Sequence, residues 1–203
     1  MNRMHPAGRG LSNRKKISAP IIFTIGHSTR PLAEFIELLR SNGVQQVIDI
    51  RTIPRSLHNP QYCRETLAPA LRSARIGYVY SKKLGGRRRA QPDSINAGWH
   101  NASFRGYADY MQTAEFSEGL QRAMNLAVTK TSALMCAEAV PWRCHRSLVA
   151  DALLIRGILV REIIGKSKPR PHKLTPFARV RGTAIAYPTD SPPARSISHR
   201  IAT

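Results

Sequence analysis

Short apolar runs alternate with amphipathic segments between residues 21 and 165. Consecutive apolar residues predict buried strands at 21–25, 47–50, 78–80, 133–136 and 158–163. Apolar residues at helical spacing predict helices at 32–39, 67–75, 104–111, 116–128 and 144–156, with Pro69 delaying the start of the second. Strands that alternate with helices favour a parallel sheet covered on both faces. The pattern predicts a single α/β domain, with a mainly parallel sheet of about five strands and helices on both faces.

The segments on either side of this domain lack such a pattern. Residues 1–20 mix Gly, Pro, Ser and basic residues, and six prolines interrupt the chain after Gly165. Such segments cannot bury enough apolar surface to fold. We therefore expect a disordered basic leader at 1–20, the α/β domain at 21–165, and a disordered, basic, Pro-rich tail at 166–203.

The positive charge is concentrated in these flanking segments. Lys and Arg total 32 against 12 Asp and Glu, which gives a net charge of +20. The leader holds five basic residues and no acid, and the tail holds eight basic residues and one acid, so together they carry +12. Charge of this kind is typical of solvated arms, and equally of arms that bind DNA or RNA through counterion release. Both interpretations stay open.

The cysteine count and the lengths of the apolar runs limit the compartment. An odd number of cysteines, three, argues against a disulfide framework and favours a reducing cytoplasm. No apolar run approaches the roughly 20 residues of a membrane span, and no apolar signal segment follows the basic leader. We therefore expect a cytoplasmic protein without membrane contact. No cofactor is predicted.

Polar residues follow four of the predicted strands. In an open α/β sheet, ligands bind beyond the carboxyl ends of the strands. The residues at those positions are His27 and Ser28, then Asp49, Arg51 and Ser56, then Gly85 and Gly86, and finally Glu138, Arg143, Cys144, His145 and Arg146. Because the ends of parallel strands meet at one edge, we expect these groups to converge on one concave site.

Several of the same segments carry a family resemblance. They are TIGHS at 24–28, DIR at 49–51 with Pro54 and Ser56, LGG at 84–86, FRGY at 104–107, CAE at 136–138 and CHR at 144–146. In this order they resemble the uncharacterised family catalogued as domain of unknown function 488, over about residues 21–165. The resemblance implies a Rossmann-like α/β fold, and it carries no settled activity.

Cys144, His145 and Arg146 stand where a helix is predicted to begin. The N–H groups and the dipole of a helix start favour an anion or a thiolate. An anion cradle, a catalytic thiol and a buried cysteine in a packed helix are the three interpretations. Cys136 with Arg143 invites comparison with thiol phosphatases, but six residues lie between them, one more than in the phosphatase signature. Zinc would need ligands such as Cys136, Cys144 and His145, whose spacing lacks the usual CxxC pair, and we predict no metal.

Glu138 is the carboxylate with the clearest candidate catalytic role. It either forms an ion pair with Arg143 or Arg146, or acts as a general base or as a stabiliser of a cationic, sugar-like transition state. The second role would suit N-glycosidic cleavage or transfer, with Tyr107, His27 and Asp49 positioning a base and ribose. Asp49 can instead form a salt bridge with Arg51, two residues along the same strand.

The remaining candidates are expected to bind rather than react. Ser28 and Ser56 would donate hydrogen bonds, and Gly85-Gly86 would let the backbone approach a ligand or simply form a tight turn. Phe104, Tyr107 and Tyr110 have helical spacing and belong to the core or to a base-stacking surface. The cations that flank the glycines would guide a polyanion or remain solvated; they are Lys82, Lys83, Arg87, Arg88 and Arg89.

Together these observations favour a protein that binds or acts on a nucleotide or nucleic acid, such as a nucleotide- or DNA-directed hydrolase. The catalytic candidates are Glu138, Cys144, His27 and Asp49. The substrate-binding candidates are Ser28, Arg51, Ser56, Gly85, Gly86, Tyr107, Arg143, His145 and Arg146. The alternatives are a non-catalytic nucleic-acid-binding module and a thiol-dependent phosphatase or sulfurtransferase.

Overall fold

A six-stranded sheet organises the chain, which a computed structural model describes for residues 20–189. The strand order is β3-β2-β4-β1-β5-β6. The strands are β1 (Ile21–Gly26), β2 (Gln46–Asp49), β3 (Gly77–Tyr80), β4 (Ser132–Cys136), β5 (Leu159–Ile163) and β6 (Arg170–Pro171). The first five are parallel, and β6 pairs with β5 in the antiparallel direction. The predicted α/β class is confirmed, and the mostly parallel sheet is consistent with a Rossmann-like fold.

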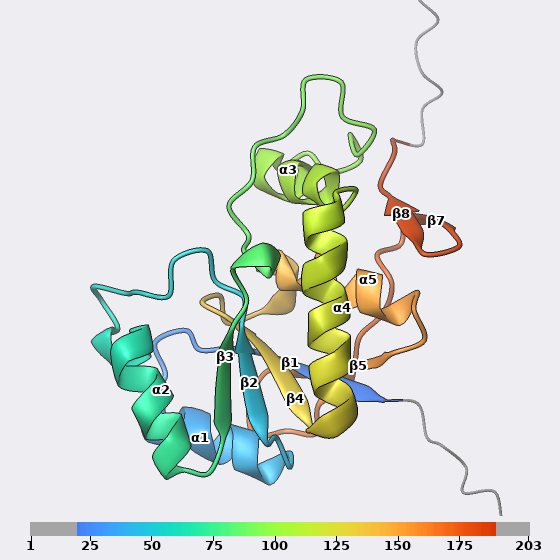
Figure 1. The fold of residues 1–203 in the computed structure, drawn as a ribbon. Helices are drawn as coiled ribbons and strands as arrows, with labels where there is room; N and C mark the ends of the chain where they lie inside the picture. The colour runs from blue at the N-terminus through green and yellow to red at the C-terminus, as the bar shows by residue number, and fades with distance from the viewer. Residues whose placement is uncertain (1–19, 190–203) are drawn as a thin grey trace, which may run out of the picture.

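Five helices cover both faces of this sheet (Figure 1). They are α1 (Leu32–Ser41), α2 (Arg64–Ser73), α3 (Ala102–Tyr110), α4 (Ala114–Thr129) and α5 (Arg146–Leu154). Three short 3-10 turns join them, η1 (Pro60–Tyr62), η2 (Lys82–Leu84) and η3 (Pro141–Arg143).

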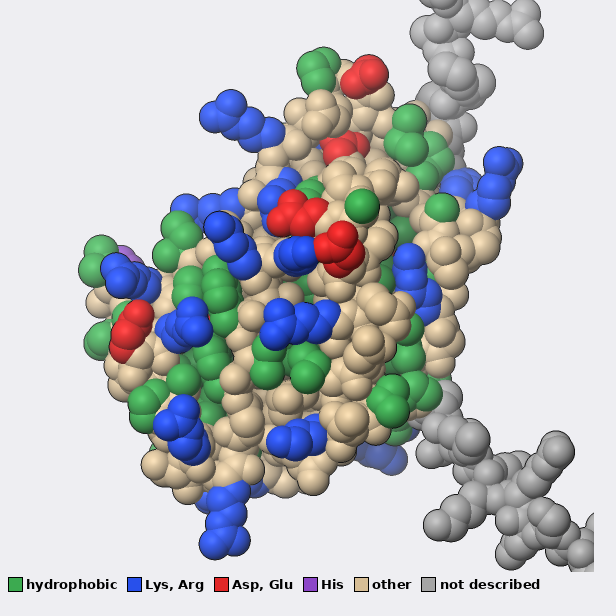
Figure 2. All heavy atoms as spheres, in the orientation of Figure 1, with side chains coloured by type: hydrophobic (Ala, Val, Ile, Leu, Met, Phe, Trp, Pro, Cys, Tyr) green, Lys and Arg blue, Asp and Glu red, His purple; other side chains and the backbone are tan. Residues whose placement is uncertain are grey.

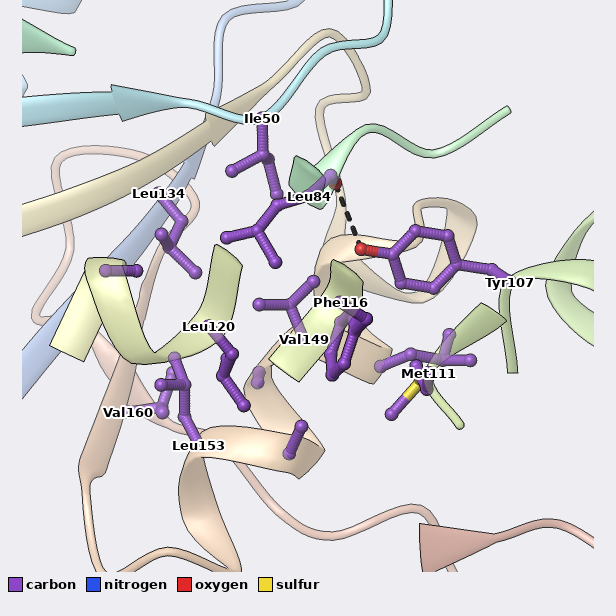
Figure 3. Packing of buried hydrophobic residues seen from close by; sticks show 14 of the residues in the cluster. Ile50, Leu84, Tyr107, Met111, Phe116, Leu120, Leu134, Val149, Leu153 and Val160 are labelled. Atoms are coloured by element: carbon purple, nitrogen blue, oxygen red, sulfur yellow. Dashed lines mark hydrogen bonds between the residues drawn. The ribbon is translucent and has the colours of Figure 1, made fainter. Parts of the chain in front are cut away.

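Alternate residues of each central strand belong to two separate cores, as the period of a strand requires. On one face, Val47 of β2 and Met135 of β4 pack with apolar side chains of α1 and α2. On the other, Ile48 and Leu134 pack with the core formed by α3, α4 and α5. Figure 3 shows this second core, in which side chains from η2, the sheet and all three helices meet.

Four helices begin two or three residues away from the predicted starts, and two of these differences, in α2 and α5, have a clear local cause. Helix α2 begins at Arg64 and contains Pro69, because a proline in the second turn removes only one backbone donor, and the end of the helix stays bonded through Ala74 N–H and Ala70 C=O. Helix α5 begins at Arg146, after the turn η3, so Cys144 precedes it.

The predicted boundary at residue 165 is also wrong, since the chain packs against the domain as far as Tyr187, which is fully buried. This C-terminal strap (residues 166–189) includes β6 and the hairpin of β7 (Arg179–Arg181) and β8 (Ala184–Ala186). Asp151 of α5 is fully buried and accepts hydrogen bonds from His172, Thr175 and Tyr187 of the strap. Polar contacts of this kind leave no periodic pattern in a sequence rich in proline. Residues 1–19 and 190–203, also predicted to be disordered, lie outside the described residues.

The strap also fixes the long loop that precedes α3, residues 87–101. Tyr187 donates its backbone N–H to the Asn96 side chain at 2.9 Å, and its carbonyl accepts the N–H of Gly98 at 2.9 Å. Asp109 holds the same loop through Ser94 and Asn96. Among residues 20–189, no helix is long and apolar enough to span a membrane.

Candidate functional site

A pocket of about 890 Å³ lies at the carboxyl ends of β1, β2 and β4. The register places Gly26 of β1 beside Cys136 of β4, so the segments that follow these strands leave the sheet side by side. The loop after η2 and the start of α3 complete the wall. The lining residues are His27, Ser28, Thr29, Arg51, Thr52, Ile53, Arg55, Ser56, Asn59, Gly86, Arg87, Arg88, Arg89, Ser103, Phe104, Cys136, Ala137, Glu138, Arg143, Cys144 and His145.

Cations dominate the rim of this pocket. Arg55, Arg87, Arg89 and Arg143 are exposed. Arg88 is half-buried, with its guanidinium 3.5 Å from the centre of the Tyr110 ring. Glu138 is the single acid among the described lining residues. Lys and Arg also outnumber Asp and Glu on the face drawn in Figure 2, so the rim is the local part of a broadly basic surface. The pocket therefore has the electrostatics of an anion-binding site.

His27 is a neutral, fixed side chain. Its ring stacks on Tyr62 with centroids 4.1 Å apart. Its Nδ1 donates to the Ser28 carbonyl at 2.7 Å, which leaves Nε2 to accept from Arg51 Nη1 at 3.3 Å. Burial, aided by the positive charge of Arg51, lowers the pKa of His27 from 6.5 to about 4. His27 can therefore orient a ligand or a neighbouring guanidinium, and it carries no charge at neutral pH.

Asp49 lies behind the pocket and not in it. It is fully buried and accepts hydrogen bonds from Arg51 Nε at 2.9 Å, from Arg51 Nη2 at 2.6 Å and from the Tyr78 hydroxyl at 2.6 Å. Burial opposes the charge of Arg51, but the hydrogen bonds to Asp49 outweigh it and raise the Arg51 pKa. The salt-bridge interpretation of this pair is the one that the geometry supports, and Asp49 is a positioning residue for Arg51.

Two thiols lie at the floor of the pocket. Cys136 and Cys144 are free, buried, and 2.8 Å apart at their sulfur atoms. Arg146 Nη1 donates to Cys136 Sγ at 2.7 Å. Burial opposes the thiolate, but the hydrogen bond from Cys144 and the charge of Arg146 lower the Cys136 pKa. The hydrogen bond to Cys136, together with burial, raises the pKa of Cys144. The arginine that contacts Cys136 is thus Arg146 and not Arg143, on which the comparison with thiol phosphatases was based.

The backbone N–H groups at the start of α5 have partners inside the chain. Arg146 N–H donates to Cys144 Sγ at 3.5 Å, and Ser147 N–H donates to the Cys144 carbonyl at 3.1 Å. The next two N–H groups both donate to the His145 carbonyl, at 3.0 and 3.1 Å. An anion cradle at this helix start, one of the interpretations of the sequence, is therefore not formed.

His145 packs where the glycine turn approaches the pocket. Its Nε2 donates to the Ile50 carbonyl at 3.1 Å, and its Nδ1 lies 3.4 Å from Cys144 Sγ. Burial lowers its pKa from 6.5 to about 4, so the ring is neutral. A Cβ atom on Gly86 would lie 2.3 Å from His145 Nδ1, and this close approach explains why glycine stands there.

Glu138 stands exposed at the pocket wall. Within the described part of the chain its carboxylate makes no ion pair, so the expected pairing with Arg143 or Arg146 is not formed. Arg146 instead binds the backbone carbonyl of Glu138, at 2.6 Å. The carboxylate is therefore free to interact with a bound molecule.

The comparison with protein families agrees with the motifs that carry these residues. A family model described as Domain of unknown function DUF488 matches residues 31–153, which include Arg51, Glu138, Cys144 and Arg146. The chain belongs to this family. No curated protein and no solved structure matches it.

The residues that the DUF488 family model matches include most, but not all, of the residues that line the pocket. His27 and Ser28 line the pocket but precede the matched residues, and strand β5 follows them. The predicted sheet-edge groups that line the pocket are His27, Ser28, Arg51, Ser56, Gly86, Glu138, Arg143, Cys144 and His145, with the loop cations Arg87, Arg88 and Arg89.

Other predicted residues of this DUF488 protein lie elsewhere. Asp49 and Arg146 are buried behind the wall, and Lys82, Lys83 and Gly85 do not line it. Tyr107 is fully buried and donates its hydroxyl to the Leu84 carbonyl at 3.0 Å (Figure 3), so it belongs to the core. The lining residues outside the predicted set of site residues are Thr29, Thr52, Ile53, Arg55, Asn59, Ser103, Phe104, Cys136 and Ala137. Of these, Phe104 was considered as a base-stacking residue, and Cys136 as a zinc ligand or a phosphatase-type thiol. Most of these lining residues follow a predicted strand within a few residues, which is the signal that could have included them.

Metal ligation has no support in the part of the chain that the structure describes. No group of three or more His, Cys, Asp or Glu side chains there is placed to hold a metal ion. His27 and His145 each use a ring nitrogen on a backbone carbonyl, and the Cys136 sulfur is occupied by Arg146 and Cys144.

Proposed function

We propose that this protein binds the phosphate groups of a nucleotide, free or within a nucleic acid, in the pocket at the carboxyl edge of the sheet. The observation that carries the proposal is the combination of a cationic rim with an apolar wall. Arg55, Arg87 and Arg89 are exposed cations that line the pocket, and Phe104 and Ile53 line it with apolar surface. Arginine pairs well with phosphate oxygens, and an aromatic face stacks on a base.

The size of the pocket fits such a ligand. Ligand pockets typically measure about 300–1,000 Å³, and this one encloses about 890 Å³. Its position at the ends of parallel strands is the usual place for a ligand in an open α/β sheet. The Arg51 side chain is held rigidly by Asp49, so it would present its remaining donor capacity at little entropic cost.

Glu138 is the catalytic candidate within this proposal. An unpaired carboxylate among arginines would act on the sugar or base of a nucleotide whose phosphates those arginines hold. General base catalysis, or stabilisation of a cationic sugar, would give N-glycosidic cleavage or transfer. Three free cysteines suit a reducing cytoplasm, where nucleotides are abundant.

Binding is tested first, with the full chain. We would measure fluorescence anisotropy of labelled nucleotides and oligonucleotides against the double variant Arg87→Ala/Arg89→Ala. The matched control is Arg72→Ala/Arg122→Ala, which removes the same charge from exposed positions outside the pocket. We expect the pocket variant to bind at least about tenfold more weakly, since a charge-assisted hydrogen bond is worth about 1.5–3 kcal/mol. The control should change affinity by less than about twofold.

Equal loss in both double variants would refute a pocket and support the non-catalytic nucleic-acid-binding module. That module should also lose most of its affinity when residues 1–19, with their five basic side chains, are removed. Steep salt dependence would accompany it.

Catalysis is tested by the release of free base from nucleosides and nucleotides, followed chromatographically. Glu138→Gln keeps the shape of the side chain and removes its charge. We expect turnover to fall by about a hundredfold or more with binding retained. Glu37→Gln, on the exposed surface of α1, is the matched control. If Glu138→Gln and the control release base at the same rate, Glu138 is not catalytic.

A further inference from the structure

The buried guanidinium of Arg146 is the starting point. Arg146 is 1% exposed, and an arginine stays protonated in a protein. Its Nη1 contacts the Glu138 carbonyl at 2.6 Å and Cys136 Sγ at 2.7 Å, and its Nη2 contacts the Ala139 carbonyl at 3.0 Å. None of these contacts is a carboxylate, and within residues 20–189 Arg146 forms no salt bridge.

A buried cation without a counter-charge is costly, so buried charges in proteins are paired. Cys136 is the group in contact with Arg146 that can take a negative charge. If Cys136 were a neutral thiol, the guanidinium of Arg146 would contact only neutral groups, namely that thiol and two backbone carbonyls. Ionising Cys136 converts the contact into a charge-assisted pair, and the lowered Cys136 pKa agrees with this.

The surroundings of Cys136 also favour a thiolate. The Cys144 thiol donates toward it across 2.8 Å. The other titratable side chain in contact with the pair is His145, which is neutral and lies against Cys144. The absence of a side chain at Gly26 creates the space, since a Cβ there would lie 2.6 Å from Arg146 Nη1 and 1.7 Å from the Glu138 carbonyl oxygen.

We propose that Cys136 and Cys144 form a redox-active dithiol centre at the floor of the pocket, with Cys136 as the thiolate that reacts with a hydroperoxide and Cys144 as the resolving thiol. Both cysteines line the pocket, so a small oxidant that enters it reaches them. The centre does not depend on which ligand the arginines at the rim bind.

The chemistry balances with hydrogen peroxide as the oxidant. Cys136 Sγ attacks one peroxide oxygen, the O–O bond breaks, and hydroxide leaves, which gives a sulfenic acid. Cys144 Sγ then attacks Cys136 Sγ, the S–O bond breaks, and water leaves with the proton of Cys144. The two sulfurs lose two electrons to the peroxide and become joined. They start 2.8 Å apart, and a disulfide bond is about 2.05 Å long, so they need to approach by less than an ångström.

The thiolate is tested directly in the full, reduced chain. Near neutral pH we expect the ultraviolet absorbance of one thiolate per chain, which disappears in Cys136→Ser and persists in Cys63→Ser. Cys63 is the matched control because it is half-buried and lies outside the pocket. If the wild-type chain shows no thiolate absorbance below the usual titration range of a cysteine, about pH 8.5, the proposal is overturned.

The reaction is tested by treating the native chain with hydrogen peroxide and mapping its peptides by mass spectrometry. We expect a disulfide between Cys136 and Cys144 that dithiothreitol reverses, and the same disulfide in Cys63→Ser. In Cys144→Ser we expect a sulfenic acid at Cys136 that dimedone traps. These two measurements need no change at Cys136, so they hold if Cys136→Ser fails to fold. Oxidation at Cys63 alone, or none at Cys136, would overturn the proposal. Nucleotide binding is measured separately, so its failure leaves this result standing.

Discussion

His172 is expected to make the stability of the fold depend on pH in a defined window. Its ring lies between two carboxylates, with Nε2 at 2.8 Å from Asp151 and Nδ1 at 2.8 Å from Glu162. Both ring nitrogens can donate only when the ring is protonated. Burial opposes the charge, but the two carboxylates outweigh it and raise the pKa of His172 from 6.5 to about 9.

This shift corresponds to about 3 kcal/mol, at about 1.4 kcal/mol for each pKa unit. Because the folded state holds the proton more tightly than the unfolded state, the stabilisation is complete below about pH 6.5. It declines as the pH rises and is lost above about pH 9. His172→Gln removes the charge and should therefore be destabilised by about 3 kcal/mol near pH 6, with the gap to the wild type closing by about pH 9.5.

Urea unfolding of both chains at several pH values measures that gap, and comparing the two removes the contribution of every other titrating group. His58→Gln is the control, because His58 is exposed and forms no ion pair with a described residue. The reasoning would be refuted if the gap between the wild type and His172→Gln stayed constant over this range or widened with pH.

Three further substitutions test contacts in and behind the wall of the pocket, with urea unfolding as the common measurement. Asp49→Asn leaves the buried guanidinium of Arg51 without its carboxylate and should cost about 3–5 kcal/mol; a loss below 1 kcal/mol would contradict the pairing. Tyr107→Phe removes one buried hydrogen bond and should lower the free energy of unfolding by about 1–2 kcal/mol without changing nucleotide affinity. Weaker nucleotide binding by this variant would show that Tyr107 belongs to the binding site. Gly86→Ala places a Cβ against His145 and should cost about 1–3 kcal/mol, so an unchanged midpoint would show that the ring moves freely.

The sequence predicted the sheet, and the edge at which the candidate site was sought, because both follow from periodicity. Apolar runs marked the parallel strands, and the ends of parallel strands meet at one edge, where His27, Arg51, Glu138 and Cys144 line one pocket. Whether a given side chain points into that pocket or behind it depends on rotamers and partners that spacing does not encode. Asp49 was therefore expected in the pocket, although it lies behind it.

The partner of Cys136 could not be read from spacing for the same reason. Arg143, suggested by the comparison with phosphatases, lies in the turn η3 and faces outward, whereas Arg146 begins α5 and reaches back beneath the end of β4. The strap was missed because its attachment depends on buried polar groups such as Asp151 and Tyr187, and not on an apolar stripe.

The attachment of the strap has a mechanical consequence for the arginines of the rim. Tyr187 is bonded both to Asp151, in the body of the domain, and to Asn96 and Gly98, in the loop that begins with the arginines of residues 87–89. A pull on the chain beyond Thr189, or a cut within the strap, would therefore loosen that loop before it disturbed any strand of the parallel sheet. The strap works as a tether on the mouth of the pocket. The part of the chain that holds the mouth in shape therefore extends well past residue 153, where the family match stops.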